Sequence, residues 1–149
     1  MKTNVLMVCL GNICRSPLAE GILKSMINTE NVFVDSAGTG GYHIGHAPDP
    51  RSIDIAKRNG IDISNQICRK FNARDFDRFD IIYAMDKENY NNILELASSA
   101  PHRTKVRLSL SEIDGGANEV PDPYYGGANG FEEVFQMIDA ACKHIAKRL

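Results

Sequence analysis

Residues 5–17 read Val5-Leu6-Met7-Val8-Cys9-Leu10-Gly11-Asn12-Ile13-Cys14-Arg15-Ser16-Pro17. The first five of them form a continuous apolar run, which is typical of a strand buried on both faces of a parallel sheet. Ser16 and Pro17 then supply a helix cap and a proline at the first helical position. Apolar residues at helical spacing follow as far as Ile27. This stretch therefore predicts a strand, a loop and a helix in direct succession.

The same alternation continues along the chain. The patterns predict strands at 32–37, 80–85 and 105–110, and helices at 49–60, from Asp86 to about Ala97, and from Phe131 to Ile145. Strands that alternate with helices indicate βαβ units and a parallel sheet. Because right-handed crossovers bring the loops after the strands to one edge, and ligands bind at that edge, we expect the loops after residues 9 and 110 to meet at a site.

Composition limits the classes of protein. With 149 residues, of which 43% are hydrophobic and 24% charged, the chain fits a single globular domain over residues 1–149. A net charge of -2 supplies no basic field for nucleic acid or an anionic membrane. The apolar N-terminal stretch is too short for a transmembrane helix or a signal peptide. We therefore expect a cytoplasmic protein, and a monomer because no long apolar run suggests an obligate dimer.

The four cysteines are Cys9, Cys14, Cys68 and Cys142. They are too few for a disulfide framework. Cys9 and Cys14 lack a second close Cys/His pair to complete a zinc tetrahedron, and the pair His43 and His46 is more typical of a solvated loop. We expect neither a metal nor a cofactor.

A cysteine followed six positions later by an arginine occurs three times, at Cys9–Arg15, Cys68–Arg74 and Cys142–Arg148. The spacing alone is therefore uninformative, and context must decide. The pair at 142–148 lies inside a helical pattern, and the pair at 68–74 has neither a strand before it nor a glycine within it. The first pair alone has a preceding strand, an internal glycine and a following Ser-Pro helix start.

That context has a chemical meaning. A loop that curls into a helix N-terminus directs backbone N–H groups toward an oxyanion. Gly11 allows a positive φ or a close backbone approach, and Asn12 tolerates the left-handed region. Arg15 has the forked donors that hold two phosphate oxygens, and the same positive environment stabilises the Cys9 thiolate. Ser16 can donate to the sulfur and cap the helix. The alternative, a buried cysteine beside a surface arginine, does not account for this combination.

A second segment, residues 119–127, contains Asp122-Pro123-Tyr124-Tyr125. It can be a proline-rich turn in which Asp122 caps the local backbone. On the same sheet edge as Cys9, however, this carboxylic acid could protonate the leaving oxygen of a phosphate ester and then activate water. Tyr124 and Tyr125 could wall a pocket for an aromatic ring.

Together these residues resemble the low-molecular-weight protein tyrosine phosphatase family. The resemblance covers the phosphate loop Cys9–Ser16, the general-acid loop 122–126, and the segments Asp35-Ser36-Ala37-Gly38, Ala47-Pro48-Asp49-Pro50-Arg51 and Met85-Asp86. It implies an α/β fold with a four-stranded parallel sheet flanked by helices, flavodoxin-like and three-layered. It also implies a phosphotyrosine-containing protein or peptide as substrate.

The resemblance further implies a mechanism. The Cys9 thiolate attacks phosphorus while Asp122 protonates the phenol oxygen, and Asp122 then acts as base for the water that releases phosphate. Arg15 and the loop hold the phosphoryl charge, Ser16 assists departure of the sulfur, and no metal is required. The supporting loop residues are Leu10, Gly11, Asn12, Ile13 and Cys14, and Tyr42 is expected in the substrate pocket with Tyr124 and Tyr125. In this family the second loop cysteine, here Cys14, can form a disulfide with the nucleophile; packing is its alternative role.

Other activities remain as alternatives. Arsenate reductases of this fold use two further, neighbouring cysteines, whereas Cys68 stands alone and Cys142 lies in the last predicted helix. Arginine phosphatases typically have threonine where Ile13 stands and lack the paired tyrosines. An inactive phosphate-binding module would not need Cys9, Arg15 and Asp122 together. A dinucleotide-binding site is disfavoured because His43 stands where a third glycine belongs.

Overall fold

The computed structural model describes residues 2–112, 119–124 and 128–149. Within them, four parallel strands form one sheet in the order β2-β1-β3-β4: β1 (Thr3–Cys9), β2 (Val32–Gly38), β3 (Ile81–Ala84) and β4 (Val106–Leu108). In the register, Cys9 of β1 faces Gly38 of β2, and Val8 faces Ala84 of β3. The strand order reverses at β1, so the carboxyl end of β1 is the switch point at which such sheets bind ligands.

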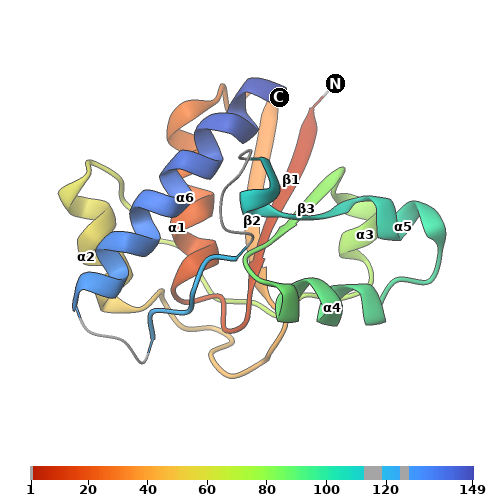
Figure 1. The fold of residues 1–149 in the computed structure, drawn as a ribbon, viewed down its shortest axis with the longest axis horizontal. Helices are drawn as coiled ribbons and strands as arrows, with labels where there is room; N and C mark the ends of the chain where they lie inside the picture. Colours follow the sequence, from red (N-terminus) through yellow and green to blue (C-terminus); the bar gives the residue numbers. More distant parts are fainter. Residues whose placement is uncertain (1, 113–118, 125–127) are drawn as a thin grey trace.

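Helices cover both faces of the sheet (Figure 1). One face carries α1 (Arg15–Met26), α2 (Pro50–Arg58) and α6 (Ala128–Arg148), and the other carries α3 (Asp75–Arg78), α4 (Lys87–Glu95) and α5 (Ala100–Thr104). Along β1, Val5 and Met7 belong to the core beneath α1 and α6, whereas Leu6 and Val8 belong to the core that includes Phe76. Successive strand residues point to opposite faces, so a strand covered on both sides must be apolar throughout. The predicted three-layer, flavodoxin-like α/β fold is confirmed.

Several predicted boundaries change. The fourth strand ends at Leu108, because Ser109–Glu112 form a 3₁₀ helix, η1. The short helices α3 and α5 were not predicted, since four or five residues are too few to show a helical period. The predicted start of α4 is confirmed: the Asp86 carboxylate accepts a hydrogen bond from Asn89 N at 2.7 Å.

The predicted start of α1 was wrong. The helix begins at Arg15 with Cys14 as its N-cap, no side chain caps it, and Ser16 lies inside the first turn. The Ser16 hydroxyl instead lies 3.0 Å from the Cys9 sulfur. An N-terminus without a side-chain cap suits anion binding, because oxygens of the anion can accept from the amides of the first turn.

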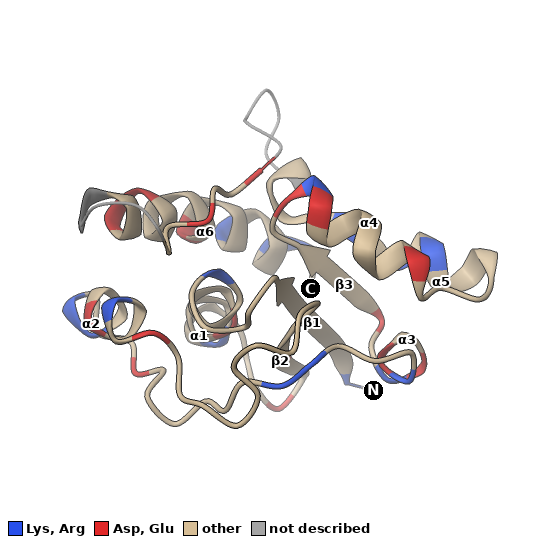
Figure 2. Ribbon diagram, turned by 90° about the horizontal axis from the view of Figure 1, so that it is seen from below, with Lys and Arg blue, Asp and Glu red and all other residues tan. Residues whose placement is uncertain are grey.

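Charged residues of both signs are interspersed over the helices (Figure 2), in keeping with the net charge of -2. In the part of the chain that the structure describes, no helix is both long and apolar enough to cross a bilayer.

Candidate active site

A pocket of about 500 Å³ opens at the carboxyl edge of the sheet. It is built by the loop after β1, by the loop after β2 and by the segment that precedes α6. Its lining residues are Cys9, Leu10, Gly11, Ile13, Cys14, Arg15, Tyr42, His43, Asp122 and Tyr124. The structure therefore brings together candidates that lie more than a hundred residues apart in the sequence. His43, which the sequence patterns placed in a solvated loop, also lines this pocket.

Arg15 is a cation at the base of this pocket, with 2% of its side chain exposed. Its Nη1 donates to Asp86 Oδ2 at 2.6 Å and to the Val120 carbonyl at 2.9 Å. Its Nη2 lies 3.6 Å from Asp122 Oδ2. Burial by itself lowers the pKa of Arg15, but the charge of Cys9 and the hydrogen bond to Asp86 outweigh it, so the pKa lies above its ordinary value. A buried charge is tolerable only when it is paired in this way.

Asn12 holds the shape of the loop from within. Its φ of 56° is the one positive value among the described non-glycine residues, as its position in the motif predicts. Its side-chain Nδ2 donates to Ser16 Oγ at 2.8 Å and to Ser36 Oγ at 2.9 Å, and its Oδ1 accepts from Arg69 N at 3.0 Å. The Cys68 thiol donates to the Asn12 carbonyl. The left-handed turn is thus held by four separate bonds.

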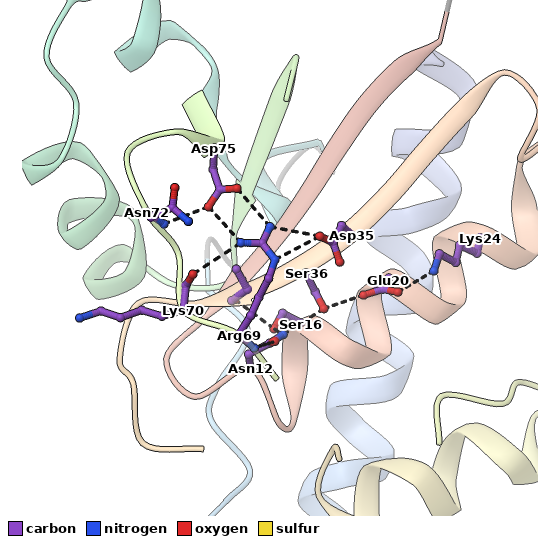
Figure 3. A network of polar contacts seen from close by, with 11 residues as sticks. Asn12, Ser16, Glu20, Lys24, Asp35, Ser36, Arg69, Lys70, Asn72 and Asp75 are labelled. Carbon is purple, nitrogen blue, oxygen red and sulfur yellow. Dashed lines mark hydrogen bonds and ion pairs between the residues drawn. The ribbon is translucent and has the colours of Figure 1, made fainter. Parts of the chain in front are cut away.

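These bonds belong to a longer network (Figure 3). Ser36 Oγ donates to Glu20 Oε1 at 2.6 Å, and Glu20 Oε2 pairs with Lys24 at 2.6 Å. Since Asn12 already donates to Ser16 Oγ, the hydroxyl hydrogen of Ser16 can point to the Cys9 sulfur at 3.0 Å or to the Ala37 carbonyl at 3.4 Å. The shorter contact indicates the sulfur, where a hydroxyl donor would stabilise a thiolate.

On the other side of Asn12, the same network fixes the segment that contains Arg69. The Arg69 guanidinium pairs with Asp35 of β2 and with the fully buried Asp75 of α3, each at 3.1 Å (Figure 3). The peptide nitrogen that bonds Asn12 belongs to this doubly anchored residue. The loop after β1 is therefore supported from β2 and α3 as well as from α1.

Two glycines permit close packing of this loop. A Cβ atom on Gly38 would lie 2.7 Å from the Leu10 carbonyl oxygen and 3.0 Å from Asn12 N, so only glycine fits there. Gly11 does not have a positive φ; it permits a close approach instead, because a Cβ atom on it would lie 3.2 Å from His43 Cδ2. Of the two roles considered for Gly11, the structure excludes the positive φ, and the atoms that approach it closely belong to side chains.

The loop that carries Asp122 is attached to the sheet edge. Val120 N donates to the Met85 carbonyl at 2.8 Å. Asp122 Oδ1 accepts from Tyr124 N at 3.0 Å, which is the local turn contact considered from the sequence, while Oδ2 faces Arg15. The Asp122 side chain is 36% exposed, so one carboxylate fixes the turn and also lies open to the pocket.

Aromatic side chains form the mouth of the pocket. Tyr42 is 74% exposed and Tyr124 is 37% exposed. The rings of His43 and Tyr124 lie 6.3 Å apart between centroids, which is within the range of aromatic contact. Tyr125, also expected here, lies outside the described residues.

The thiols differ in their surroundings. Cys14 and Cys68 pack in one small cluster with Ile13 and Phe131, so Cys68 lies against the loop although the sequence shows it as isolated. Burial, and after it the charges of Asp49 and Cys9, raise the pKa of Cys14. Burial and the charge of Cys9 raise the pKa of Cys68 to about 11. Both are therefore protonated thiols at neutral pH.

Sequence reasoning missed the supporting residues Arg69, Glu20 and Asp75. It named Ser36 and Asp86 in family-like segments, but it gave Ser36 no role and Asp86 only that of a helix cap. The one available signal was that Asp86 directly follows a strand, where side chains reach the ligand edge. Among the described residues, no group of three or more His, Cys, Asp or Glu side chains is placed to hold a metal ion.

Comparison with known proteins identifies the family. Residues 4–149 match the family model described as low molecular weight phosphotyrosine protein phosphatase. The protein of that name from Schizosaccharomyces pombe is 41% identical over 142 residues, which cover 91% of this chain and 90% of the relative. The Bacillus subtilis low molecular weight protein-tyrosine-phosphatase YfkJ is 40% identical, over 95% of this chain and 92% of that protein.

Solved structures agree with this result. A crystal structure of the protein tyrosine phosphatase from Entamoeba histolytica, with Hepes in the active site, superposes with a TM-score of 0.93 at 38% identity, over 99% of this chain and 96% of that one. Vibrio vulnificus Wzb in complex with benzylphosphonate has a TM-score of 0.89 at 30% identity, over all of both chains. The chain therefore belongs to the low molecular weight phosphotyrosine protein phosphatase family.

Proposed function

We propose that this protein hydrolyses phosphotyrosine in proteins and peptides, and small aryl phosphates, through a phosphocysteine at Cys9. The observation that carries the proposal is that one pocket at a helix N-terminus contains a cysteine, a buried arginine and an open carboxylate: Cys9, Arg15 and Asp122. These are the groups that nucleophilic phosphoryl transfer needs.

In the first step the Cys9 thiolate attacks phosphorus and the bond to the phenol oxygen breaks. Asp122, protonated at this stage, delivers its proton to that oxygen, so tyrosine leaves as a neutral phenol. Arg15 and the loop amides bind the charge on the equatorial oxygens of the phosphoryl group. In the second step Asp122 removes a proton from water, which attacks phosphorus and releases phosphate. The Ser16 hydroxyl stabilises the departing thiolate of Cys9.

The aromatic mouth of the pocket supports a phenolic ester as substrate. Tyr42 and Tyr124 can contact the flat ring, and Ile13 adds an apolar wall. A relative of this fold, Wzb, has been solved with benzylphosphonate, a phosphonate that carries an aromatic ring. This chemistry distinguishes the proposal from hydrolysis of phosphoserine or phosphoarginine.

The test compares phosphotyrosine, phosphoserine and phosphoarginine as substrates and measures arsenate reduction, for the wild type and for Cys9→Ser. We expect phosphotyrosine to give by far the highest kcat/KM, and Cys9→Ser to abolish turnover while it still binds phosphate. Preferred hydrolysis of phosphoarginine would instead indicate an arginine phosphatase, and predominant arsenate reduction would indicate an arsenate reductase. Phosphotyrosine binding without turnover in the wild type would indicate a binding module.

We also infer reversible oxidation at the same loop. A peroxide oxidises the Cys9 thiolate to a sulfenic acid, and the Cys14 sulfur then displaces water to form a disulfide. The position of both cysteines on one pocket wall supports this. Peptide mapping after peroxide treatment should find the Cys9–Cys14 bridge, and a treated sample that contains only over-oxidised Cys9 would contradict it.

For the chain as a whole, we propose one phosphatase domain over residues 1–149, acting as a cytoplasmic monomer. The match of the family model from residue 4 to residue 149 supports the single domain. Light scattering at micromolar concentration tests the monomer, and a mass twice that of the 16.5 kDa chain would reject it.

A further inference from the structure

A second cavity, of about 530 Å³, lies beside the candidate active site, between α2 and the start of α6. Pro50, Ile55 and Phe131 contribute apolar atoms to its lining. Figure 1 shows α2 next to the first turns of α6, on the same side of the sheet as α1. Neither the proposed chemistry nor the hydrogen-bond network around Asn12 uses this cavity.

The two cavities share a wall. The Arg51 side chain lines the second cavity, and its guanidinium carbon lies 5.4 Å from the ring centroid of Tyr124, which lines the first. The same guanidinium lies 4.6 Å from the ring of Phe131. A tyrosine ring and one stacked guanidinium therefore separate the phosphate pocket from the second cavity, and a peptide bound at one lies within reach of the other.

Arg51 is held firmly in this wall. Asp49 accepts from its Nε at 3.0 Å and from its Nη2 at 2.9 Å, a two-point contact that fixes the plane of the guanidinium. Asp49 N in turn donates to the Ile13 carbonyl of the phosphate-binding loop at 2.8 Å. The wall formed by Arg51 and Tyr124 is thus linked to the loop by hydrogen bonds through Asp49. These bonds fix the positions of the two cavities relative to each other.

The charges around the second cavity indicate what it can accept. Its charged lining residues are two arginines and two acids: Arg51, Arg58, Asp54 and Glu132. Arg58 already pairs with Asp54 at 2.6 Å, and Arg51 already pairs with Asp49. Figure 2 shows both signs of charge on α2 and on α6. Glu132 accepts a hydrogen bond from Gln136 at 3.3 Å. The two positive and two negative charges of the lining balance, so they favour neither an acidic nor a basic side chain, whereas Pro50, Ile55 and Phe131 favour an apolar one.

We propose that this cavity is a substrate subsite that binds an apolar side chain of the peptide, next to the phosphotyrosine. The proposal rests on the proposed function, because the peptide is placed by its phosphotyrosine in the first pocket. It adds a selectivity that the phosphate loop cannot supply, since in the proposed mechanism that loop contacts the phosphotyrosine itself and not its neighbours in the peptide. Arg51 acts as the shared wall of both sites.

The test uses phosphotyrosine peptides of alanine in which one leucine is moved through the positions on either side of the phosphotyrosine, at constant charge. We expect the wild type to prefer leucine at one position by about three- to tenfold in kcat/KM, the range for partial burial of such a side chain. Glu132→Trp should fill the cavity and reduce the three- to tenfold leucine preference to a ratio near one. The readout is the ratio of kcat/KM for the leucine peptide to that for p-nitrophenyl phosphate.

Glu133→Trp is the matched control, because Glu133 is also exposed on α6 but does not line the cavity; it should retain the preference. Asp54→Trp blocks the cavity from the opposite wall and provides a second variant if the first does not fold. The subsite is rejected if the wild type shows no leucine preference, or if the Glu133→Trp control loses the preference as fully as Glu132→Trp does. Failure to hydrolyse p-nitrophenyl phosphate at all would instead reject the proposed function.

Discussion

At the scale of single residues, Arg15 is paired with two unequal carboxylates. Asp86 lies at 2.6 Å and is itself fixed as the cap of α4, whereas Asp122 lies at 3.6 Å. The close partner compensates the buried cation, so Arg15 stays paired throughout the proton transfers that the proposed mechanism assigns to Asp122. Asp122 is thereby suited to proton transfer, and Asp86 to positioning.

Asp122→Ala should lower kcat by about 10²–10⁴-fold on aryl phosphates with poorly acidic phenols, because general-acid catalysis contributes most when the leaving oxygen is basic. The loss should shrink for p-nitrophenyl phosphate. The measurement is the dependence of kcat on the pKa of the leaving phenol, with inhibition by inorganic phosphate as the control for binding. Equal losses for every phenol would contradict the acid role.

Gly38→Ala should impair the phosphate loop although Gly38 carries no reacting group. Its Cβ atom would meet backbone atoms of Leu10, Gly11 and Asn12 at 2.7–3.0 Å, and backbone cannot move aside as the end of a side chain can. We expect at least about a tenfold loss of kcat/KM, because small displacements of catalytic groups are costly. Gly41→Ala is the control, since the nearest atoms to its Cβ would be the Cδ atoms of the flexible Ile44 and Lys70 side chains, at 3.3 and 3.6 Å. Wild-type kinetics for Gly38→Ala would show that the loop does not require this contact.

At the scale of elements, α2 acts as a support for the phosphate loop. Its N-cap Asp49 bonds Ile13 through the backbone, and Ser52 Oγ donates to the Cys14 carbonyl at 3.3 Å. The helix N-terminus is thus joined to the outer side of the loop, whereas Asn12 supports the inner side. Substitutions that destabilise α2 should therefore also destabilise the site.

Asp49→Ala should lower the free energy of unfolding by about 1–2 kcal/mol, because it removes an N-cap and the partner of Arg51. Burial by itself raises the pKa of Asp49, but hydrogen bonds from Arg51 outweigh it and the pKa lies below its ordinary value. The contribution is therefore fully present above the unfolded-state pKa and is lost as pH falls through the folded-state pKa. Urea unfolding at pH 7 and at successively lower pH should show the difference from wild type narrowing in acid.

Asp54→Ala is the matched control on the same helix. Its ion pair with Arg58 is exposed on both sides, so we expect a loss below about 1 kcal/mol. A cost as large as that of Asp49→Ala, or a cost for Asp49→Ala that does not fall in acid, would contradict this account of the cap.

At the scale of the whole molecule, the fold gathers one site from distant parts of the chain. The loops that begin after β1 and β2 and the segment before α6 converge at one edge, over two cores that hold the sheet from both sides. A ligand that bridges these segments binds only the folded state. Its binding free energy therefore adds to the stability of the fold.

Inorganic phosphate should raise the melting temperature. At a concentration of about a hundred times its Kd, the stabilisation is about 2.7 kcal/mol, which corresponds to about 5–10 °C for a chain of this size. Differential scanning calorimetry with chloride at equal ionic strength is the comparison. Cys9→Ser should retain the shift, since Arg15 and the amides carry the binding. An equal rise of the melting temperature in chloride would show that the effect comes from ionic strength and not from phosphate binding.

A structural feature can be predicted from the sequence when residues close along the chain determine it, and not when contacts between distant elements do. The strand at residues 5–9, the positive φ of Asn12 and the cap of α4 are set by neighbouring residues, so local patterns predict them. The cap assigned to Ser16 was wrong because its hydroxyl lies against Cys9, a tertiary contact that overrides its local preference. Ser36, Arg69 and Asp75 support Asn12 from other elements, and no local pattern connects them with it.

The sequence by itself determined that an apolar strand runs into a loop and a helix, and which side chains in that loop are suited to hold an oxyanion. Both follow from interactions between residues close along the chain. Topology also predicted that the loop with Asp122 shares a sheet edge with Cys9. The tertiary structure alone decided that Asp122 Oδ2 lies 3.6 Å from Arg15, that Glu20 and Asp75 belong to the network around Asn12, and that Arg51 separates two cavities. These depend on the packing of helices against the two faces of the sheet, which places atoms within a few ångströms of one another whatever their separation in sequence.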